Sequence, residues 1–306
     1  MQKIKLNKTD LMVSPVCLGA DRFGAARDKD TAFAMLDRFL EAGGNFIDTA
    51  SLYARDFEAG ISRSEEVLGQ YLKARPGADI IIATKGGHHE LPSKRTRINR
   101  EEIVADLDES LRTLGLDHID FYWLHRDRPE IPVEEIVDIL EEQVKAGKIR
   151  FYGGSNYALA RLQAADAYAK ATGVQGFSGV SNHYTPAVET PGCPLYNDDT
   201  LVTDSTEILP EYAKLGLAYI PYGSTAKGWF AKSLTGDASE RAVKSFENET
   251  NRALRDKLVL QAKEAGIPVQ TALLRYMAAY GEKIGLQIVP ITSCSKLEQL
   301  EDVVKF

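Results

Sequence analysis

The chain has 306 residues, of which 44% are hydrophobic and 26% charged, and its formal net charge is −7 at pH 7. This composition is typical of a globular protein, and the acidic balance argues against general nucleic-acid binding. No apolar run approaches the roughly 20 residues that a membrane-spanning helix needs, so we expect no membrane partner. Three cysteines far apart in sequence favour a reducing compartment, and we expect a cytoplasmic protein, either a monomer or a small homo-oligomer.

In chain order, the first twelve residues predict a short β-hairpin with residues 7–10 as its turn. Apolar stretches then alternate with segments of helical spacing. Strands are expected at 13–18, 46–47, 80–84, 118–124, 149–153, 176–181, 218–222 and 286–291. Helices are expected at 31–42, 64–73 (with Ser64 as N-cap), 100–114, 133–146, 158–172, 206–215, 251–265, 268–280 and from 296 onward.

Eight strand–helix alternations with short connections predict right-handed crossovers and a parallel sheet. Eight such units in roughly 290 residues fit a (β/α)8 barrel, here as one domain over 1–306. The rival is a doubly wound open sheet, which calls for a GxGxxG turn after the first strand. Residues 19–24 read Gly-Ala-Asp-Arg-Phe-Gly instead. In a barrel, the long connections 185–204 and 227–250 and the basic segment 88–99 would lie over the C-terminal face.

Ionisable residues stand at the ends of three consecutive predicted strands. Asp48, Lys85 and His125 occupy these positions, and Tyr53 follows Asp48 by five residues. Each alone has a simple structural explanation, such as a cap, a solvated lysine or a partly buried aromatic ring. The C-terminal ends of parallel strands meet at one face, however, so the four side chains are expected to share a site.

This set of side chains permits acid catalysis. A phenol with a pKa of about 10 is too weak an acid at neutral pH, and a nearby lysine would lower that pKa. The carboxylate would hold the lysine, and the histidine would donate a hydrogen bond to a substrate oxygen. Together they could protonate a carbonyl oxygen while a hydride reaches its carbon.

The stretch from Asn45 to Tyr53 resembles the signature of the aldo-keto reductase family, and Gly60, Ser64-Glu65 and Leu68-Gly69 continue it. Residues 111–125 and 147–156 resemble two further hallmarks, and the resemblance runs from about residue 4 to the C-terminus. It implies a (β/α)8 barrel and reversible NAD(P)H-dependent reduction of an aldehyde or ketone to an alcohol. The substrate would be a small-molecule carbonyl compound, such as a sugar. The resemblance implies that Asp48, Tyr53, Lys85 and His125 form the catalytic tetrad, with Tyr53 as general acid.

The same resemblance implies a cofactor site. Ser155 and Asn156 would hydrogen-bond the nicotinamide carboxamide, and Tyr222 would stack on its ring. The family's further amide-binding glutamine is missing after the sixth strand, where Asn182 or His183 could replace it. The other expected contacts are Gly19, Ala20, Asp48, Gly223, Ser224, Lys227, Gly228, Ser293, Ser295, Lys296, Gln299 and Asp302.

The nucleotide itself is expected to be NADPH, with NADH as the alternative. In many family members an arginine stands at the position of Gln299, and a basic residue there pairs with the 2′-phosphate of NADP. Lys296 is the candidate for that role in this chain.

Three other interpretations were weighed. His88, His89, His125 and Asp48 could be drawn as metal ligands, but neighbouring histidines in a loop are expected to point apart, so no metal site is predicted. The basic run Lys94, Arg95, Arg97 and Arg100 is either a solvated loop or an attractor for acidic or phosphorylated substrates. Lastly, a barrel of this family could be a nucleotide-binding regulatory protein with slow or no turnover.

Overall fold

Eight parallel strands form the centre of the structure, which is a computed structural model describing residues 1–91 and 93–306. Every hydrogen-bonded pair in this sheet is parallel. In sheet order the strands are β11 (Ala218–Tyr219), β10 (Gly179–Ser181), β9 (Ile149–Ser155), β8 (Ile119–Leu124), β7 (Ile81–Gly86), β4 (Phe46–Asp48), β3 (Cys17–Gly19) and β12 (Ile291–Thr292).

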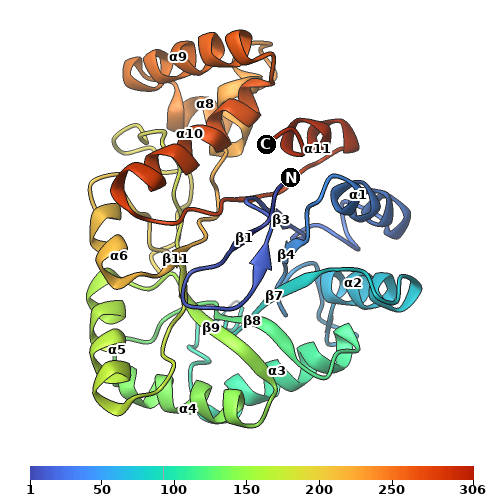
Figure 1. Ribbon diagram of the computed structural model, residues 1–306, viewed down its shortest axis with the longest axis vertical. Coiled ribbons are helices and arrows are strands. Elements are labelled where there is room, and N and C mark those ends of the chain that lie inside the picture. The colour runs from blue at the N-terminus through green and yellow to red at the C-terminus, as the bar shows by residue number, and fades with distance from the viewer. Residues whose placement is uncertain (92) are drawn as a thin grey trace.

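Backbone hydrogen bonds join the two ends of this sheet into a closed barrel. The Tyr219 N–H donates to the Gln287 carbonyl at 2.9 Å, and the Ile291 N–H donates to the Pro221 carbonyl at 2.9 Å. Figure 1 shows the resulting ring of strands with helices around it. The predicted (β/α)8 barrel is therefore confirmed.

The helices follow the strands as expected, but the C-terminal third holds additional short ones. Helix α6 begins at Leu209 rather than at residue 206, because Pro210 in its first turn has a backbone angle already suited to a helix start. The segment 227–250, expected as a polar connection, contains η1, α7 and α8. The helices are α1 (Lys29–Glu41), α2 (Arg63–Ala74), α3 (Arg100–Leu114), α4 (Val133–Lys145), α5 (Leu159–Thr172), α6 (Leu209–Leu215), η1 (Ala226–Gly228), α7 (Trp229–Lys232), α8 (Glu240–Phe246), α9 (Glu249–Ala265), α10 (Val269–Ile284) and α11 (Leu297–Val303).

Helix α2 begins two residues earlier than Ser64 would require as its cap. The Ser62 hydroxyl accepts a hydrogen bond from the Glu65 N–H and is the N-cap. Ser64 lies within the first turn, where its hydroxyl donates to the Ala20 carbonyl at 2.7 Å. A small hairpin that the sequence did not indicate, β5 (Arg55–Asp56) and β6 (Ile61–Ser62), leads into this helix. Ser64 therefore ties α2 to the end of β3 instead of capping the helix.

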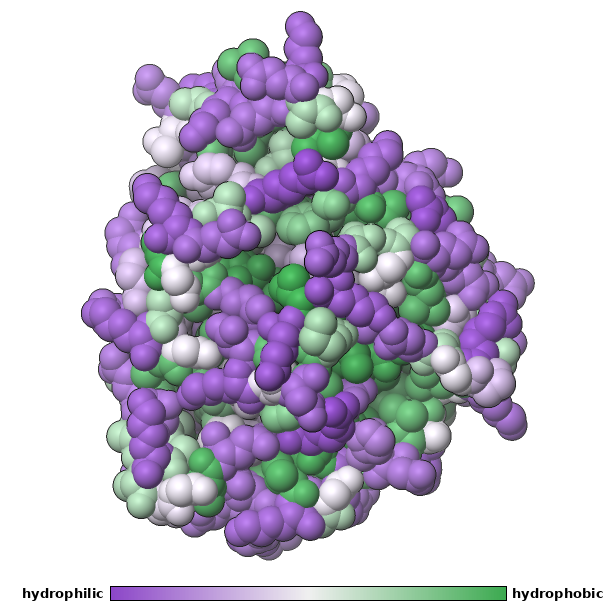
Figure 2. Space-filling model, viewed as in Figure 1, coloured by the Kyte–Doolittle hydropathy of each residue, from purple (hydrophilic) through white to green (hydrophobic). Residues whose placement is uncertain are grey.

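A second hairpin, β1 (Ile4–Lys5) and β2 (Met12–Val13), lies across the N-terminal end of the barrel, as the sequence predicted. Its residues Leu6, Leu11 and Val13 are buried in one apolar cluster with Phe121 and Trp123 from inside the barrel. In Figure 1 the hairpin crosses the middle of the ring. Figure 2 shows the same face, where polar residues predominate and hydrophobic residues are exposed in small groups between them. The hairpin closes the barrel floor.

Successive side chains of a strand point alternately into the barrel and toward the helices, which separates two apolar layers. The same alternation decides which ionisable side chains point into the barrel. In β8, Phe121 and Trp123 belong to the inner cluster, whereas Tyr122 and Leu124 pack against the helices. Side chains two residues apart point to the same face of a strand. The residue that follows in the inner series is His125.

The same alternation holds in two neighbouring strands. Phe46 of β4 and Ala83 of β7 belong to the inner cluster. The next inner positions along these strands are Asp48 and Lys85. Three ionisable side chains are therefore placed at the C-terminal end of the barrel interior, above the apolar floor.

The first half of the long connection 185–204 packs on the additional helices, and its second half bonds to the end of the barrel, where Arg126 Nε donates to the Thr200 hydroxyl at 2.9 Å. Ala187 and Leu195 share a separate apolar cluster with Trp229, Phe246 and residues of α9 and α10. The Asn251 side chain accepts from the Val188 N–H at 2.8 Å and donates to the Val188 and Phe246 carbonyls at 2.8 Å. Among the described residues, no helix is long and apolar enough to cross a membrane.

Candidate active site

A buried ion pair lies at the C-terminal end of the barrel interior. Lys85 Nζ donates to Asp48 Oδ2 at 2.5 Å and to the Thr49 carbonyl at 2.8 Å. Both side chains of the pair are at most 3% exposed. Burial raises the pKa of Asp48, and the charge of Lys85 opposes this shift. The two charges hold each other at short range, as predicted, and together they carry no net charge.

Tyr53 and His125 complete the predicted group of four. Lys85 Nζ lies 4.6 Å from the centre of the Tyr53 ring. The Tyr53 and His125 rings meet edge to face, with 5.7 Å between their centres and 83° between their planes. Residues from the ends of β4, β7 and β8 therefore converge, and a proton donor, a cation and an imidazole lie within contact distance of one another.

The electrostatics at Tyr53 differ from the expectation in one respect. Burial raises the pKa of the phenol well above its usual value, and the charges of Asp48 and Asp21 add to that shift. The cation that opposes it is Arg126, not Lys85. Tyr53 therefore remains a neutral phenol and retains its proton at neutral pH.

His125 is buried and uncharged at neutral pH. Burial lowers its pKa well below the usual 6.5, and the charges of Arg126, His88 and Lys85 lower it further. Its Nδ1 atom is buried without a hydrogen-bond partner among the described residues. A neutral imidazole in this place can donate one hydrogen bond to a ligand without bringing a charge.

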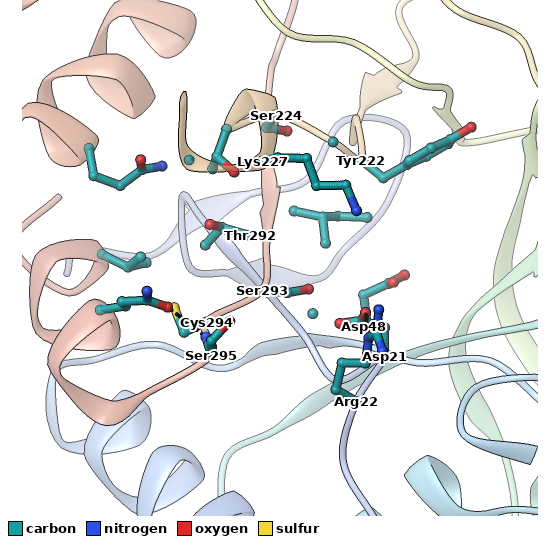
Figure 3. A pocket seen from close by; sticks show the side chains of 18 of the residues that line it. Asp21, Arg22, Asp48, Tyr222, Ser224, Lys227, Thr292, Ser293, Cys294 and Ser295 are labelled. Atoms are coloured by element: carbon teal, nitrogen blue, oxygen red, sulfur yellow. Dashed lines mark hydrogen bonds and ion pairs between the residues drawn. The ribbon is translucent and has the colours of Figure 1, made fainter. Parts of the chain in front are cut away.

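A cavity of about 470 Å³ opens above these residues and runs along the C-terminal face. In the view of Figure 3, Tyr222 and Asp48 lie toward one end, and Cys294 and Ser295 lie toward the other. The predicted residues that line it are Gly19, Asp48, Tyr53, Tyr222, Gly223, Ser224, Lys227, Gly228, Ser293, Ser295, Gln299 and Asp302. The cavity extends from Asp48 and Tyr53 to the C-terminal motif at residues 293–299.

The remaining predicted residues do not line this cavity. They are Ala20, Lys85, His125, Ser155, Asn156, Asn182, His183 and Lys296. Most of them are buried beside the cavity. Ala20 contributes a backbone hydrogen bond, in which its N–H donates to the Asp48 carbonyl at 2.8 Å. Lys296 is different, because it is exposed at the start of α11.

Ser155 and Asn156 lie where β9 ends, beside Tyr222. The Tyr222 hydroxyl donates to Asn156 Oδ1 at 2.6 Å, and Asn156 Nδ2 donates to the His125 carbonyl at 3.1 Å. The Ser155 hydroxyl donates to the Ser181 carbonyl at 2.8 Å. Asn156 has a left-handed backbone, with φ of 62°, which asparagine tolerates better than most residues. These contacts bring the expected amide-binding pair and the expected stacking ring together.

Asn182 and His183, the two replacements considered for the missing glutamine, have different surroundings. The Asn182 side chain is fully buried and bonds to both backbone groups of Tyr157, to Asp204 and to the Tyr212 hydroxyl. Its hydrogen-bonding groups are therefore occupied within the fold.

His183 retains a free nitrogen. Its Nδ1 lies 3.1 Å from the Thr203 hydroxyl, and its Nε2 is buried without a partner among the described residues. The ring also packs against Tyr222, with 5.6 Å between centres. Gly223 allows this approach, because a Cβ there would lie 2.6 Å from His183 Nε2. Of the two candidates, His183 is the one with an unused hydrogen-bonding atom.

The loop after β11 has the form of an anion cradle. Gly223, Ala226, Lys227 and Gly228 all have positive φ angles, and the loop lines the cavity. Successive turns of this kind gather backbone N–H groups around a concave surface. Lys227 is exposed at the edge of this loop, and its Nζ lies 5.5 Å from the centre of the Tyr196 ring. This segment suits a diphosphate.

The C-terminal motif differs from the expectation in its basic residue. Gln299 Oε1 accepts from the Ser295 N–H at 2.7 Å, so the motif is folded back onto α11. Lys296 does not line the cavity, whereas Arg27, from the loop before α1, does. Four further lining residues were not among the predicted site residues, although they stand in loops expected at the pocket: Arg27, Asp21, Arg22 and Tyr196.

The histidines of the 88–99 segment do not point apart, contrary to our expectation. The rings of His88 and His89 pack with 4.2 Å between centres, and His88 also packs against His125 at 4.7 Å. The His88 Nδ1 is turned back to the His89 carbonyl at 2.8 Å, which holds the two rings together. Within residues 1–91 and 93–306, no three His, Cys, Asp or Glu side chains are grouped to hold a metal ion.

The basic run of the same segment is neutralised by carboxylates. Its cations pair with acidic residues of α3, α4 and the neighbouring loops, and none of them lines the cavity. The pairs are Lys94–Asp199, Arg95–Glu102, Arg97–Asp106 and Arg100–Glu142. This arrangement favours the interpretation as a solvated loop.

A parallel barrel with a buried Asp–Lys–Tyr–His group beside an elongated cavity defines a class of barrel oxidoreductases that use a dinucleotide. The sequence comparisons give the family. The model of the Aldo/keto reductase family matches residues 15–306, and the chain belongs to that family. It is an oxidoreductase of a family that reduces carbonyl compounds with nicotinamide cofactors.

Similar proteins come from bacteria and fungi. Uncharacterized oxidoreductase YrpG of Bacillus subtilis is 29% identical, over 100% of this chain and 90% of that protein. Norsolorinic acid reductase stcV of Emericella nidulans is 28% identical, over 95% of this chain and 73% of that protein. Aryl-alcohol dehydrogenase [NADP(+)] of Phanerodontia chrysosporium is 28% identical, over 95% and 77%.

Proposed function

We propose that this enzyme reduces an aldehyde or ketone to an alcohol with NADPH, and that Tyr53 is the general acid. The observation that carries the proposal is the contact of Tyr53 with both Lys85 and His125 at the end of the cavity. A neutral phenol is the form that can give a proton, and the raised pKa of Tyr53 keeps it in that form.

The residues around the cavity fit a nicotinamide dinucleotide. The partnerless Nε2 of His183 is suited to a carboxamide, and Tyr222 to the ring. Ser155 and Asn156 lie beside them, and a carboxamide would have to replace some of their present hydrogen bonds. The cradle at 223–228 is suited to the diphosphate, and the segment 293–299 to the adenosine. When bound, the nicotinamide supplies the hydride.

The side chains of this chain then handle the proton. The O–H bond of Tyr53 breaks as its proton moves to the carbonyl oxygen of the substrate, which becomes the alcohol oxygen. The phenolate left behind faces Lys85, whose charge stabilises it at 4.6 Å from the ring. His125, held neutral, donates a hydrogen bond that orients the same oxygen. Asp48 keeps Lys85 in place.

The lining of the cavity adds aromatic carbonyl compounds to the substrate classes that deserve testing. Tyr53, Tyr196 and Tyr222 line the cavity, so flat aromatic groups have several rings on which to pack. Two relatives are named for norsolorinic acid and for aryl alcohols. Aryl aldehydes and aryl ketones therefore belong beside sugars and other small polar carbonyls on the test panel.

The first test is titration with NADPH and NADH, followed by turnover on this panel. We expect Tyr53→Phe to bind NADPH within about threefold of the wild type and to lose at least about 100-fold in kcat, since general acid catalysis contributes 10²–10⁴-fold. Unchanged kcat would remove Tyr53 from the acid role. If the wild type binds the nucleotide but turns over none of the compounds, the regulatory interpretation is favoured instead.

A further inference from the structure

Arg27 is a buried cation in the cavity wall. The residue is 7% exposed, and its Nε donates to the Cys294 carbonyl at 2.8 Å. That is the one hydrogen bond its guanidinium makes within the described part of the chain, so Nη1 and Nη2 are free. No carboxylate of residues 1–91 and 93–306 lies within ion-pair distance of it, because the nearby Asp21 pairs with Arg22 at 3.4 Å.

An unpaired buried charge is unfavourable, and such charges in proteins are normally matched by an opposite charge. Burial lowers the pKa of Arg27, which reflects this cost. A guanidinium nevertheless stays protonated at any working pH. Because Arg27 faces the cavity, an anion bound in the cavity would be its counter-charge.

The position of Arg27 in the cavity indicates which anionic group of a bound nucleotide would lie next to it. Its bond to Cys294 fixes the guanidinium at the motif 293–299, the end of the cavity suited to the adenosine. Figure 3 places Cys294 and Ser295 away from Tyr222 and Lys227, where the nicotinamide and the diphosphate are expected. With Nε engaged, the two amino groups remain as a fork for two oxygens of one phosphate.

The other cations near this end are less suitable. Lys296 is exposed and does not line the cavity. Arg22 is also exposed and is paired with Asp21. Asp302 lines the same end, so a phosphate there needs a cation to offset that carboxylate.

We propose that Arg27 binds the 2′-phosphate of NADPH and makes the enzyme select NADPH over NADH. The inference rests on the proposed function and adds to it the residue that recognises the nucleotide. The cation thus comes from the loop between β3 and α1, not from α11, where the sequence had placed it.

The test compares nucleotides that differ only by this phosphate. Wild type, Arg27→Met and Arg27→Lys are titrated with 2′,5′-ADP, 5′-AMP, NADPH and NADH by calorimetry or tryptophan fluorescence. We expect Arg27→Met to weaken 2′,5′-ADP and NADPH by about 10- to 100-fold, as for the loss of a charge-assisted hydrogen bond, and the other two ligands by less than about threefold. Arg27→Lys should retain part of the discrimination.

The matched comparison is Lys296→Met, which removes a cation from the same end of the cavity. Loss of discrimination in this variant and not in Arg27→Met would overturn the proposal. Equal weakening of all four ligands by Arg27→Met would also overturn it, because Arg27 would then serve the diphosphate or only the loop. The ratio of the affinities for NADPH and NADH, measured on one sample, does not depend on the fraction of folded protein. Partial misfolding of a variant therefore cannot imitate the expected result.

The outcome is separable from that of the proposed function. Wild type that reduces carbonyls equally well with NADH would contradict the role of Arg27 and leave the reductase intact. Wild type that discriminates by the 2′-phosphate but turns over no carbonyl compound would contradict the reductase and leave the role of Arg27 intact.

Discussion

Burial is the largest influence on the pKa of the Tyr53 phenol, and nearby charges act beside it. Asp48 and Asp21 raise the pKa of the phenol, and Arg126 opposes them. In the proposed mechanism the phenol of Tyr53 is therefore neutral before the reaction, and the role proposed for Lys85 is to stabilise the phenolate that forms. The pKa of Tyr53 is thus raised, where the sequence led us to expect that Lys85 would lower it.

At the residue scale we predict that His125 does not titrate in the working range. Because burial and the charges of Arg126 and His88 lower its pKa well below 6.5, kcat for carbonyl reduction should show no inflection from this imidazole between about pH 5 and 8. The measurement is the pH profile of kcat at saturating NADPH. An inflection near pH 6.5 that disappears in His125→Asn would contradict the prediction.

The sequence was informative for residues on strands and uninformative for residues on irregular loops. Asp48, Lys85 and His125 end apolar strands, so their common position followed from the parallel sheet. Arg27 and Tyr196 reach the cavity through loop conformations that follow no periodicity. Residue type alone did not decide between Asn182 and His183, because the difference lies in which hydrogen bonds the surrounding fold occupies.

At the element scale, α2 is joined to β7 through a buried carboxyl group. The Thr84 hydroxyl donates to Glu65 Oε1 at 2.5 Å, and Oε2 has no partner among the described residues. Burial raises the pKa of Glu65 to about 7, against the opposing hydrogen bond of Thr84. The folded state thus favours the protonated acid, and the contact becomes costly when the acid ionises.

This contact predicts how stability depends on pH. The contribution of Glu65 is fully present below its unfolded pKa of 4.5 and is lost as the pH rises to about 7. Over that range the free energy of unfolding of the wild type should fall relative to Glu65→Gln by on the order of 3 kcal/mol. Urea unfolding at several pH values measures the difference. The control is Glu66→Gln, half-buried on the same helix, and parallel profiles for wild type and Glu65→Gln would refute the prediction.

Elements with strong periodicity were predicted well, and short ones were not. Long amphipathic helices such as α3 and α4 can be predicted from the regular spacing of the apolar residues on one face. Helices α7 and α8 have only 4 and 7 residues, too few to show a period, and their polar composition suggested a loop. Their packing against α9 and α10 is what stabilises them.

At the scale of the whole molecule, residues 187–195 pack with the additional helices in one apolar cluster. Asn251 is fully buried and joins them through Val188 and Phe246. We predict that Asn251→Ala frees the segment 187–195, because it removes hydrogen bonds that contribute about 1 kcal/mol each.

Hydrogen exchange in that segment should accelerate by at least about tenfold, and KM for the carbonyl substrate should rise. Amides of β8 serve as the internal reference, since the barrel should keep its protection. Equal acceleration in β8 would mean that the variant destabilises the whole fold and not the segment 187–195 alone.

The barrel followed from the order of elements, since eight alternations leave few parallel arrangements. Its closure rests on backbone bonds between Tyr219 and residues near β12, which no sequence pattern encodes. The independent cluster around Trp229 likewise depends on contacts between distant segments.

The hairpin β1–β2 covers the end of the barrel opposite the active site. Leu6, Leu11 and Val13 are buried in the apolar cluster of the floor, and the Asp48–Lys85 pair is at most 3% exposed. Water entering there would screen the charges of Asp48 and Lys85 next to Tyr53, although it would contact neither the substrate nor the nucleotide. Substitutions in the first thirteen residues can thus weaken catalysis from the opposite end of the barrel.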